Sequence, residues 1–507
     1  MLARMASMVI AAALLVSGCT SSGDGAIQRK GPASTTSSLP DSDQDQDSSD
    51  GEGGSTSSPT DGPLDGLGSP TSVGDPVTPG AGAEGIDVLS YDLDLNVADP
   101  QGPISATVLI TVKAEQELAA LNLDLHGLTV ESATIDDLPV DVSRDGDELS
   151  LKPKSPIPQD TEFVAAISYS GDPNPVEDPS APGVIGWLDR ESGSFVAAEP
   201  IGTKAFLPSN DHPSDKALFS FTITAPENLT AIANGVLAEK LTENGMTSWR
   251  YTQSDPMATY LIQIAVGDYD LIEATGPRGM QIRHAVVRNL SEEQRTLLDQ
   301  TAAQIEFFET LFGPYPLDTY GLLVADSSPE FALETQTLTL MPASWLRGNT
   351  DEFSRVAAHE LAHQWYGDSI TPSSWSDIWL NESFATYAEW LWADHAGIQP
   401  LEDSIEEGKQ VAEEGRGIYG PIDDPRPTEI FSINVYYGGG YVLHALRLEI
   451  GDEQFFELLR RWAADNAGDN VSTEDFEALA AEITGSDLTD FFETWLRSDS
   501  LPALPNK

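Results

Sequence analysis

Two histidines and the glutamate beside the first of them are the residues of this chain best suited to chemistry. His359 and His363 stand four residues apart in the segment His-Glu-Leu-Ala-His, and Glu360 follows the first histidine. On an α-helix this spacing places both imidazoles on one face, where they can reach one metal ion. The glutamate can then act on a water molecule that the metal holds. The pattern predicts a metal-dependent hydrolase, and a solvated polar helix face is the alternative.

A catalytic zinc site needs a third protein ligand and keeps one position open. Glu382 follows His363 after eighteen intervening residues, and it opens an apolar segment that predicts a second helix packed against the first. The alternative is a third histidine six residues after His363, but that position holds Ser369. We therefore expect one zinc ion on the two histidines and Glu382.

The composition of the chain excludes several classes of protein. The chain has 507 residues, with 82 acidic against 26 basic side chains and a formal net charge of −56. Binding to nucleic acid by phosphate neutralisation is excluded because the dominant force would be repulsive. A single cysteine allows neither an intramolecular disulfide nor a thiolate-rich metal site. No stretch approaches about 18 consecutive apolar residues, so no membrane-spanning helix is expected.

The N-terminal residues predict export and a lipid anchor. Residues 1–18 resemble a secretory signal, because Arg4 supplies a positive charge and residues 5–16 form a short apolar core. The segment Val-Ser-Gly before Cys19 resembles the bacterial lipobox, in which cleavage leaves the cysteine lipidated at the new N-terminus. An ordinary cleaved signal with an incidental cysteine is the alternative. We expect an extracytoplasmic lipoprotein that contacts the membrane only through the lipid on Cys19.

Beyond the cysteine, the chain divides into a tether and a β domain. Residues 19–85 are rich in Ser, Thr, Gly, Pro and Asp, which predicts a flexible tether. Along residues 91–97 apolar and polar side chains alternate, as in a strand with one buried face. We assign residues 86–287 to an N-terminal antiparallel β-sandwich or saddle. Further strands are expected at 104–112, 121–125, 163–169, 219–223 and 260–266.

From about residue 288 the apolar residues follow helical spacing. Ser291 is expected to cap a helix that Gly313 ends, and Ser472 with Asp475 forms another capping pattern. The fold class is therefore α+β and multidomain, with a mostly helical catalytic domain over residues 288–507. Further helices are expected at 353–366, 381–396, 436–449, 453–466 and 473–484.

The metal segment and its surroundings resemble a known family. The segment HELAHQWYGD, the eighteen-residue interval and the segment WLNESFATYAE are similar to those of the zinc aminopeptidases related to aminopeptidase N and leukotriene hydrolase. The segments 208–217, 312–316 and 491–496 also fit this family. The resemblance implies a thermolysin-like (gluzincin) catalytic domain with zinc on the residues named above. It implies that Glu360 is the general base on a zinc-bound water, and that Asn381 and Glu389 orient ligands. For Glu389, helix packing is the alternative.

The resemblance also implies an oxyanion donor and its position. The family carries a tyrosine segment before an apolar helix, and Tyr436 occupies the place of the tyrosine that stabilises the oxyanion. Gly438 replaces a lysine that is usual in this segment, which leaves the register open. Tyr437 is the competing candidate.

Two glutamates match the positions at which the family recognises a free α-amine. Glu334 stands for the glutamate of a Gly-Ala-Met-Glu-Asn segment, although Phe331 replaces its glycine and Thr335 its asparagine. Glu199 matches a second amine contact in the β domain, with Ala197 where glutamine is usual. An ordinary exposed loop carboxylate is the alternative for Glu199. A carboxylate suits the ammonium group of a peptide electrostatically.

Together these features predict a monomeric zinc aminopeptidase whose partners are peptide substrates with a free N-terminus. An endopeptidase or another hydrolase on the same zinc site is one alternative, and an inert membrane-tethered binding protein is another. Relatives with a large C-terminal helical domain use it to enclose the active site. Only eleven residues follow Leu496, so we expect an open cleft between the two domains.

Overall fold

The alternating segment at the start of the β domain forms the long strand β1 (Ile86–Asn96). The computed structural model of the protein describes residues 72–326 and 331–505. Along β1 the side chains of Tyr91, Leu93 and Leu95 are buried, whereas the polar residues between them are exposed. The strand predicted from this alternation is confirmed.

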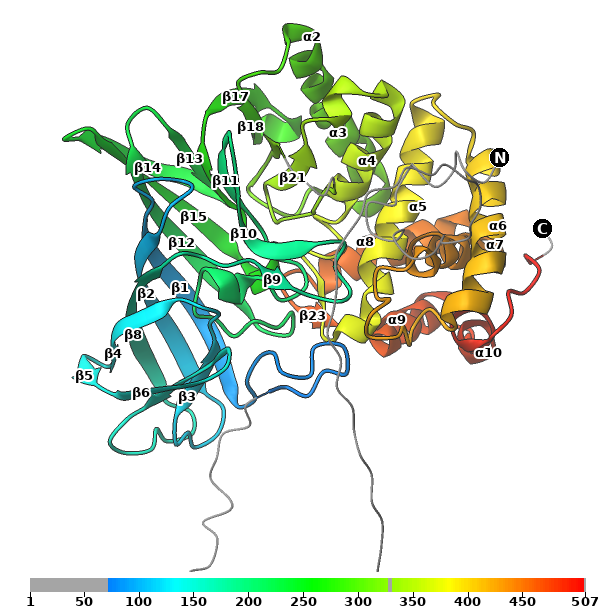
Figure 1. The fold of residues 1–507 in the computed structure, drawn as a ribbon. Coiled ribbons are helices and arrows are strands. Elements are labelled where there is room, and N and C mark those ends of the chain that lie inside the picture. Colours follow the sequence, from blue (N-terminus) through cyan, green and yellow to red (C-terminus); the bar gives the residue numbers. More distant parts are fainter. Residues whose placement is uncertain (1–71, 327–330, 506–507) are drawn as a thin grey trace, which may run out of the picture. The chain divides into compact units, whose positions relative to one another are not determined.

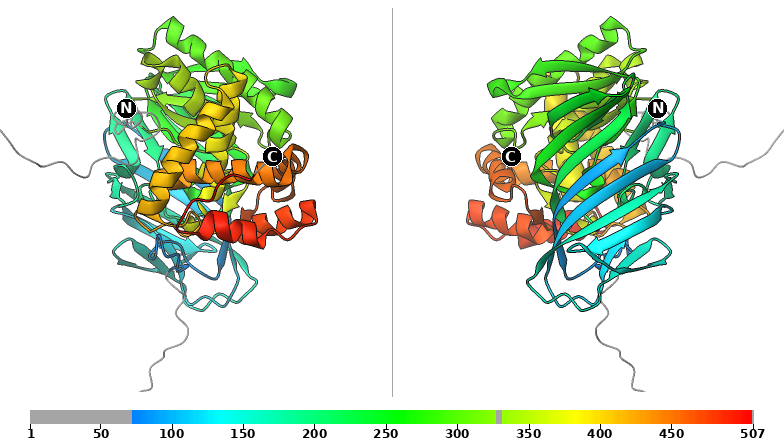
Figure 2. Two further views of the ribbon diagram at one scale, coloured as in Figure 1. Left: turned by 90° about the vertical axis from the view of Figure 1, so that its right-hand side faces the viewer. Right: turned by 90° about the vertical axis from the view of Figure 1, so that its left-hand side faces the viewer.

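β1 is an inner strand of an eight-stranded sheet, which forms the main layer of the β domain (Figure 2, right). Its neighbouring strands are antiparallel except β1 and β12, which run parallel. The buried face of this sheet contributes to the hydrophobic core. In sheet order the strands are β14 (Val236–Glu243), β15 (Met246–Ala258), β12 (Lys216–Pro226), β1, β2 (Ile104–Ala114), β8 (Glu162–Gly171), β4 (Thr129–Ile135) and β5 (Leu138–Pro139).

Two smaller sheets complete the β domain. A three-stranded sheet has the order β3 (Leu121–Asp124), β7 (Glu148–Lys152), β6 (Asp141–Asp145). A five-stranded sheet has the order β13 (Thr230–Ala233), β16 (Ile264–Gly267), β11 (Gly193–Ala197), β10 (Val184–Arg190), β9 (Val176–Glu177).

One predicted strand is shorter than expected. The segment 260–266 was expected to be extended throughout, but Thr259–Leu261 forms a 3₁₀ turn and the strand begins at Ile264. Tyr260 is buried in this turn, and its hydroxyl donates to the carbonyl of Gly367 at 3.3 Å. Burial against residues of the predicted catalytic domain (288–507; called the catalytic half below) therefore overrides the strand propensity of these residues.

Helices predominate after the β domain (Figure 1). Both predicted capping patterns are confirmed, because Ser291 and Ser472 each form a complete capping box. Residues 296–299 form a 3₁₀ turn between the first two helices. The helices are α2 (Glu292–Arg295), α3 (Gln300–Phe312), α4 (Thr350–Ala362), α5 (Trp379–His395), α6 (Leu401–Tyr419), α7 (Gly439–Ile450), α8 (Asp452–Asp465), α9 (Thr473–Thr484) and α10 (Thr489–Phe492).

One mixed sheet and one helix were not predicted from the sequence. Strand β17 (Tyr269–Thr275) pairs with β18 (Gln281–Val287), and β18 pairs in turn with strands that follow the expected domain boundary at residue 288. Helix α6 has three internal glycines, which weaken its helical signal. The remaining strands are β19 (Thr319–Tyr320), β20 (Leu322–Ala325), β21 (Thr339–Pro342), β22 (Thr371–Pro372) and β23 (Asn470–Val471).

The packed part of the chain begins before residue 86. Asp75 is 5% exposed and accepts hydrogen bonds from the Ser374 hydroxyl at 2.8 Å and the Trp375 amide at 2.9 Å. Its Oδ2 also lies 3.3 Å from Nε2 of His212 in the β domain. The end of the expected tether is therefore fixed to both halves of the protein.

The predicted signal, the lipidation site Cys19 and most of the tether lie outside the described residues. Among the residues that are described, no helix combines the length and the apolar character needed to cross a membrane.

Candidate active site

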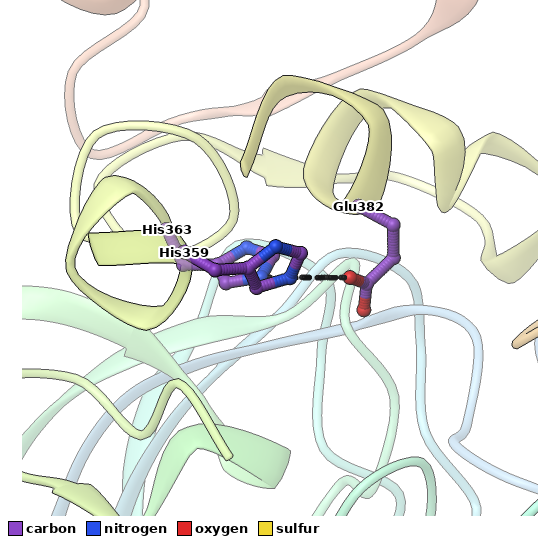
Figure 3. Close-up of side chains that lie close together, drawn as sticks. All are labelled: His359, His363 and Glu382. Carbon is purple, nitrogen blue, oxygen red and sulfur yellow. Dashed lines mark hydrogen bonds and ion pairs between the residues drawn. The ribbon is translucent and has the colours of Figure 1, made fainter. Parts of the chain in front are cut away.

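Helices α4 and α5 bring the three expected metal ligands together (Figure 3). His359 on α4 and His363, the residue that caps the C-terminal end of α4, project toward Glu382 on α5. Nε2 of His359 lies 3.2 Å and Nε2 of His363 lies 3.5 Å from the same Glu382 oxygen, Oε2. One ligand atom from each residue lies within 4.8 Å of the others, and all three side chains are buried.

The turn after α4 fixes the distance between the two helices. Gly367 has φ +134°, a backbone conformation that favours glycine. A Cβ at this position would lie 3.2 Å from the Asn381 amide and 3.2 Å from Nδ1 of His363. Glycine therefore permits the chain after α4 to pass close to both the second histidine and the start of α5.

The hydrogen bonds of His363 indicate a cation site. Its Nδ1 lies 3.1 Å from the carbonyl of Tyr366, which accepts, so the proton of a neutral ring resides on Nδ1. Nε2 then directs a lone pair at the carboxylate of Glu382. Two acceptors that face each other in a buried site are stabilised by a cation between them. Two imidazole nitrogens and one carboxylate oxygen are the donor set of a catalytic zinc site, so the residues fit this ion.

The surrounding carboxylates determine the charge of His359. Burial lowers the pKa of this imidazole, but the hydrogen bond to Glu382 and the proximity of Glu389 outweigh burial and raise the pKa to about 10. The site thus favours positive charge at the position between the ligands.

Arg355 lies behind the metal ligands, and its role was not predicted from the sequence. Glu389 on α5 places Oε2 3.6 Å from Nδ1 of His359, and its Oε1 accepts from Arg355 at 2.8 Å (Nε) and 2.7 Å (Nη2). Arg355 lies one helical turn before His359, and it also donates to Gln399 at 3.0 Å. The sequence could have indicated this role, because Arg355 shares a face of α4 with His359. A cavity of about 190 Å³ reaches this ion pair from the outside.

Asn381 has a different partner from the one that the resemblance implies. Its side-chain amide donates to the hydroxyl of Tyr260 at 3.2 Å. This bond ties the start of α5 to the β domain.

Glu360 is buried next to the two histidines. Burial raises the pKa of its carboxyl to about 8, against the effect of the two imidazoles and with the help of Glu334 and Glu382. A raised pKa of this kind suits a group that exchanges protons near neutral pH.

A π-helical turn, Asn434–Gly438, presents a tyrosine to the metal ligands. The ring of Tyr436 stacks on the ring of His359, with centroids 5.9 Å apart and planes 15° apart. The ring of Tyr437 lies instead 5.9 Å from that of Trp390. Of the two candidates, Tyr436 therefore faces the site. Such π turns are frequent at functional sites.

Steric crowding explains why position 438 holds a glycine. A Cβ at Gly438 would lie 2.6 Å from Oδ1 of Asn434, within the same π turn. The lysine that is usual in the resembling family would thus be crowded in this turn.

The two expected amine contacts lie beside the metal ligands. Ligand oxygens of Glu199, Glu334 and Glu382 all fall within 4.8 Å of one another. Oε1 of Glu199 and Oε1 of Glu334 are buried, and neither has a hydrogen-bond partner in the described part of the chain. Burial and neighbouring carboxylates raise the pKa of Glu199 well above its usual range. Glu334 also has a raised pKa, chiefly because it is buried.

The loop that carries Glu334 is held by its main chain. The side-chain amide of Gln364, just after α4, donates to the Glu334 carbonyl at 2.9 Å. Thr335 is fully buried, and its hydroxyl contacts the carbonyl of Leu338 within the loop. Thr335 thus stabilises the loop. Phe331 is partly exposed and packs on the edge of the core.

Exposure differs between the two sides of the site. Glu199 and Tyr436 are partly exposed, whereas the three metal ligands and Glu334 are buried. Solvent therefore reaches the site from the side of Glu199 and Tyr436. An open cleft between the domains stays a prediction.

Comparison with known families gives two adjacent matches. The family model described as the peptidase M1 N-terminal domain matches residues 88–261, and the peptidase family M1 domain matches residues 296–495. The second match contains all the site residues on α4, α5 and the π turn. Glu199 lies within the first.

Solved structures and curated relatives agree with these matches. The M1 zinc metallopeptidase of Deinococcus radiodurans is 32% identical, with a TM-score of 0.78 over 86% of this chain and 99% of that one. A leucyl aminopeptidase of Saccharolobus solfataricus is 24% identical over 82% of this chain, and aminopeptidase M1-A of Oryza sativa is 29% identical over 62%. The chain spans only 54% and 38% of the length of these two curated relatives.

Proposed function

Because this chain belongs to peptidase family M1, we propose that it is a zinc-dependent aminopeptidase that releases N-terminal residues from peptides. The solved relative from Deinococcus radiodurans was also crystallised, in a substituted form, with a Tyr-Ser-Ala substrate. Curated relatives with names such as leucyl aminopeptidase support the same substrate class.

The observation that carries this proposal is the pair of unpartnered carboxylates beside the metal ligands. Oε1 of Glu199 and Oε1 of Glu334 are buried without a hydrogen-bond partner among the described residues. A buried carboxylate without a partner is costly, and a bound ammonium group would satisfy it. The α-amine of a peptide therefore fits between these two residues. An endopeptidase would have no use for such an arrangement, because its substrates offer no free amine at the cleavage site.

One zinc ion would be held by His359, His363 and Glu382. When bound there, it supplies Lewis-acid polarisation of the scissile carbonyl and lowers the pKa of a water molecule. Oε2 of Glu389 lies 3.6 Å from Nδ1 of His359 as an ion-pair partner, and the carbonyl of Tyr366 accepts a hydrogen bond from Nδ1 of His363, so both groups are placed to orient the imidazoles.

Two further side chains would handle protons and charge. Glu360 is placed to accept a proton from the attacking water and to pass it to the leaving amine. Burial and the nearby carboxylates raise the pKa of Tyr436 well above 10, so its phenol keeps its proton at neutral pH. The phenol can then donate a hydrogen bond to the oxyanion that develops on the substrate.

Release of amino-acid arylamides tests the activity, with and without a chelator. We expect turnover that the chelator abolishes and that added zinc restores. Peptides that differ only in N-terminal acetylation test the amine recognition, and the acetylated forms should resist cleavage. Equal cleavage of both forms would indicate an endopeptidase. Zinc binding without turnover on a broad panel would indicate an inert binding protein.

We also propose that the protein acts outside the cytoplasm as a monomer anchored through a lipid on Cys19. The signal-like residues 1–18 and the lipobox-like segment before Cys19 support this location. Replacement of Cys19 by alanine should move the protein from the membrane fraction to the soluble fraction. Retention of the variant on membranes would contradict the anchor.

A further inference from the structure

The segment directly before β1, residues 72–85, forms a strap that contacts both halves of the protein. In Figure 1 the strap is the blue loop that leads into β1. The amide of Val73 donates to the carbonyl of Ala81 at 3.4 Å, and Oδ1 of Asp75 accepts from the amide of Val77 at 2.7 Å. These bonds give the strap a shape of its own and leave Oδ2 of Asp75 for partners outside it.

The β domain holds the strap by its main chain. The amide of Gly82 donates to Oδ2 of Asp124 at 2.9 Å, and the amide of Ala83 donates to Oδ1 of Asn210 at 2.7 Å. Gly82 has φ +68°, and a Cβ at this position would lie 2.8 Å from the Cβ of His212. Glycine therefore lets the strap pass directly against His212.

His212 connects the β domain to the carboxylate of Asp75. Its Nδ1 accepts from the amide of Ser214 at 3.2 Å, so the proton of a neutral ring lies on Nε2, 3.3 Å from Oδ2 of Asp75. Burial alone would raise the pKa of Asp75, but the hydrogen bonds that its carboxylate accepts outweigh burial and hold the pKa well below its usual range. Asp75 is therefore ionised at neutral pH.

On the catalytic side, a chain of hydrogen bonds runs from Asp75 to Glu382. Oδ2 of Asp75 accepts from the amide of Trp375 at 2.9 Å, where a 3₁₀ turn over Trp375–Asp377 begins. The carbonyl of Trp375 accepts from the amide of Ile378 at 3.3 Å, and the carbonyl of Ile378 accepts from the amide of Glu382 at 3.1 Å. The third metal-ligand candidate is thus connected to the strap through consecutive main-chain bonds.

Packing makes this connection stiff. The ring of Trp375 is fully buried and meets the ring of Tyr260 edge-on, with centroids 5.0 Å apart. The hydroxyl of Ser374 donates to Oδ2 of Asp75 at 2.8 Å. A shift of the strap would therefore pull on a closely packed turn, and close-packed interiors transmit such displacements.

We propose that Asp75 is a positioning residue that, through the strap, fixes the start of α5 and therefore Glu382 relative to the β domain. Its negative charge faces the first amides of the turn that leads into α5, where the peptide dipoles favour an anion. His212 supplies the fixed point in the β domain, which also carries Glu199. This inference rests on the metal site of the proposed function, whereas its test needs no turnover.

Zinc affinity of the full-length protein tests the proposal. Asp75→Ala should raise the zinc dissociation constant about tenfold, the lower end of the range for groups that orient metal ligands. Asp99→Ala is the matched control, because Oδ1 of Asp99 accepts from the amide of Gln101 at 3.1 Å in an exposed turn of the β domain. It should keep the affinity of the wild type. Competition with a chromophoric chelator gives the constants, and an unchanged affinity in Asp75→Ala would overturn the proposal.

Hydrogen exchange on the apoprotein separates positioning from general stabilisation. The amides of Ile378 and Glu382 should exchange about tenfold faster in Asp75→Ala than in the wild type, as expected when a buried hydrogen bond is lost. In Asp99→Ala they should exchange as in the wild type. A lower unfolding temperature of Asp75→Ala with unchanged exchange at these two amides would overturn the positioning role.

Two milder variants keep the test valid if the alanine variant does not fold. Asp75→Asn keeps the size and one acceptor oxygen, and loss of the charge near the helix start should weaken zinc binding about threefold. Gly82→Ala leaves the carboxylate intact but pushes the strap away from His212, so its zinc affinity should also fall. Wild-type affinity in both variants would overturn the proposal. Absence of peptidase activity in the wild type, with these affinities as expected, would contradict the proposed function alone.

Discussion

The hydroxyl of Ser383 donates to the carbonyl of Val435 at 2.7 Å. Ser383 directly follows the metal-ligand candidate Glu382, and Val435 directly precedes Tyr436. This bond thus connects the third metal ligand to the tyrosine that faces the metal site. Gly439 makes it feasible, because a Cβ there would lie 1.7 Å from the Ser383 hydroxyl.

Removal of this hydroxyl should misplace the tyrosine. We expect Ser383→Ala to lower kcat about tenfold, since a lost buried hydrogen bond costs about 1–3 kcal/mol. KM and zinc content should stay near those of the wild type. The check is steady-state kinetics with metal analysis on the same sample. A variant with an unchanged kcat would show that packing alone positions Tyr436.

The role of Glu360 as general base can be tested separately from metal binding. Glu360→Gln should lower kcat by about 100-fold to 10,000-fold, the range for loss of general acid–base catalysis. Zinc content should remain close to that of the wild type, because Glu360 is not among the three ligands. Metal analysis and single-turnover kinetics would check this, and retained activity would assign the proton transfer to another group.

The two neighbouring tyrosines form a matched pair. Tyr436→Phe should lower kcat by about 100-fold to 1000-fold, the usual loss when an oxyanion donor is removed. Tyr437→Phe should have little effect on kcat, because the Tyr437 ring packs against Trp390. The measurement is kcat for both variants on one arylamide. The opposite order of effects would exchange the roles of the two tyrosines.

Arg355 should act through Glu389 on the metal. Arg355→Met keeps much of the apolar stem but removes the ion pair, and we expect zinc affinity to fall about 10-fold to 100-fold. Competition with a chromophoric chelator would measure this. Arg347→Met is the control, because the Arg347 side chain is 40% exposed and its nearest carboxylate oxygen lies 3.9 Å away. Equal zinc affinity in wild type and Arg355→Met would exclude a positioning role.

A buried histidine outside the site should make stability depend on pH. Nδ1 of His284 accepts from the Leu322 amide at 3.0 Å, and burial lowers the pKa of the ring from 6.5 to about 4. Between these values the unfolded chain binds the proton and the folded protein does not, so His284 stabilises the fold above pH 6.5 and less so as pH falls.

Urea unfolding at several pH values tests this dependence. His284→Asn keeps an acceptor but does not titrate. The wild type should lose about 3 kcal/mol of its free energy of unfolding relative to this variant between pH 6.5 and 4. A difference that does not change with pH would mean that the folded protein also protonates His284.

Local patterns in the sequence predicted much of the site. The four-residue spacing of His359 and His363 and the apolar segment that begins near Glu382 place these residues on two helices, and the structure brings them together. The capping box at Ser472 was equally local. Such features depend on residues three to four positions apart, which a single sequence shows directly.

Long-range contacts could not be predicted in the same way. Nothing local pairs Arg355 with Glu389, which lies 34 residues later. The parallel pairing of β18 with β20 also depends on how the chain returns to the sheet. Thr259–Leu261 turns instead of extending because Tyr260 contacts residues of the catalytic half. These outcomes are decided by tertiary packing.

A force applied to the chain before Asp75 would act first on the contacts that Asp75 makes. Its carboxylate holds Ser374 and Trp375 in the catalytic half and contacts His212 in the β domain. A pull on the preceding chain, as from an anchor at the membrane, would be shared between both halves before it reached β1. The same contacts would mark the limit for proteolytic shedding. Cleavage before Asp75 would leave its contacts with both halves in the released protein, whereas cleavage after it would separate Asp75 from the folded chain and leave the halves joined by other contacts, such as that of Tyr260 with Asn381.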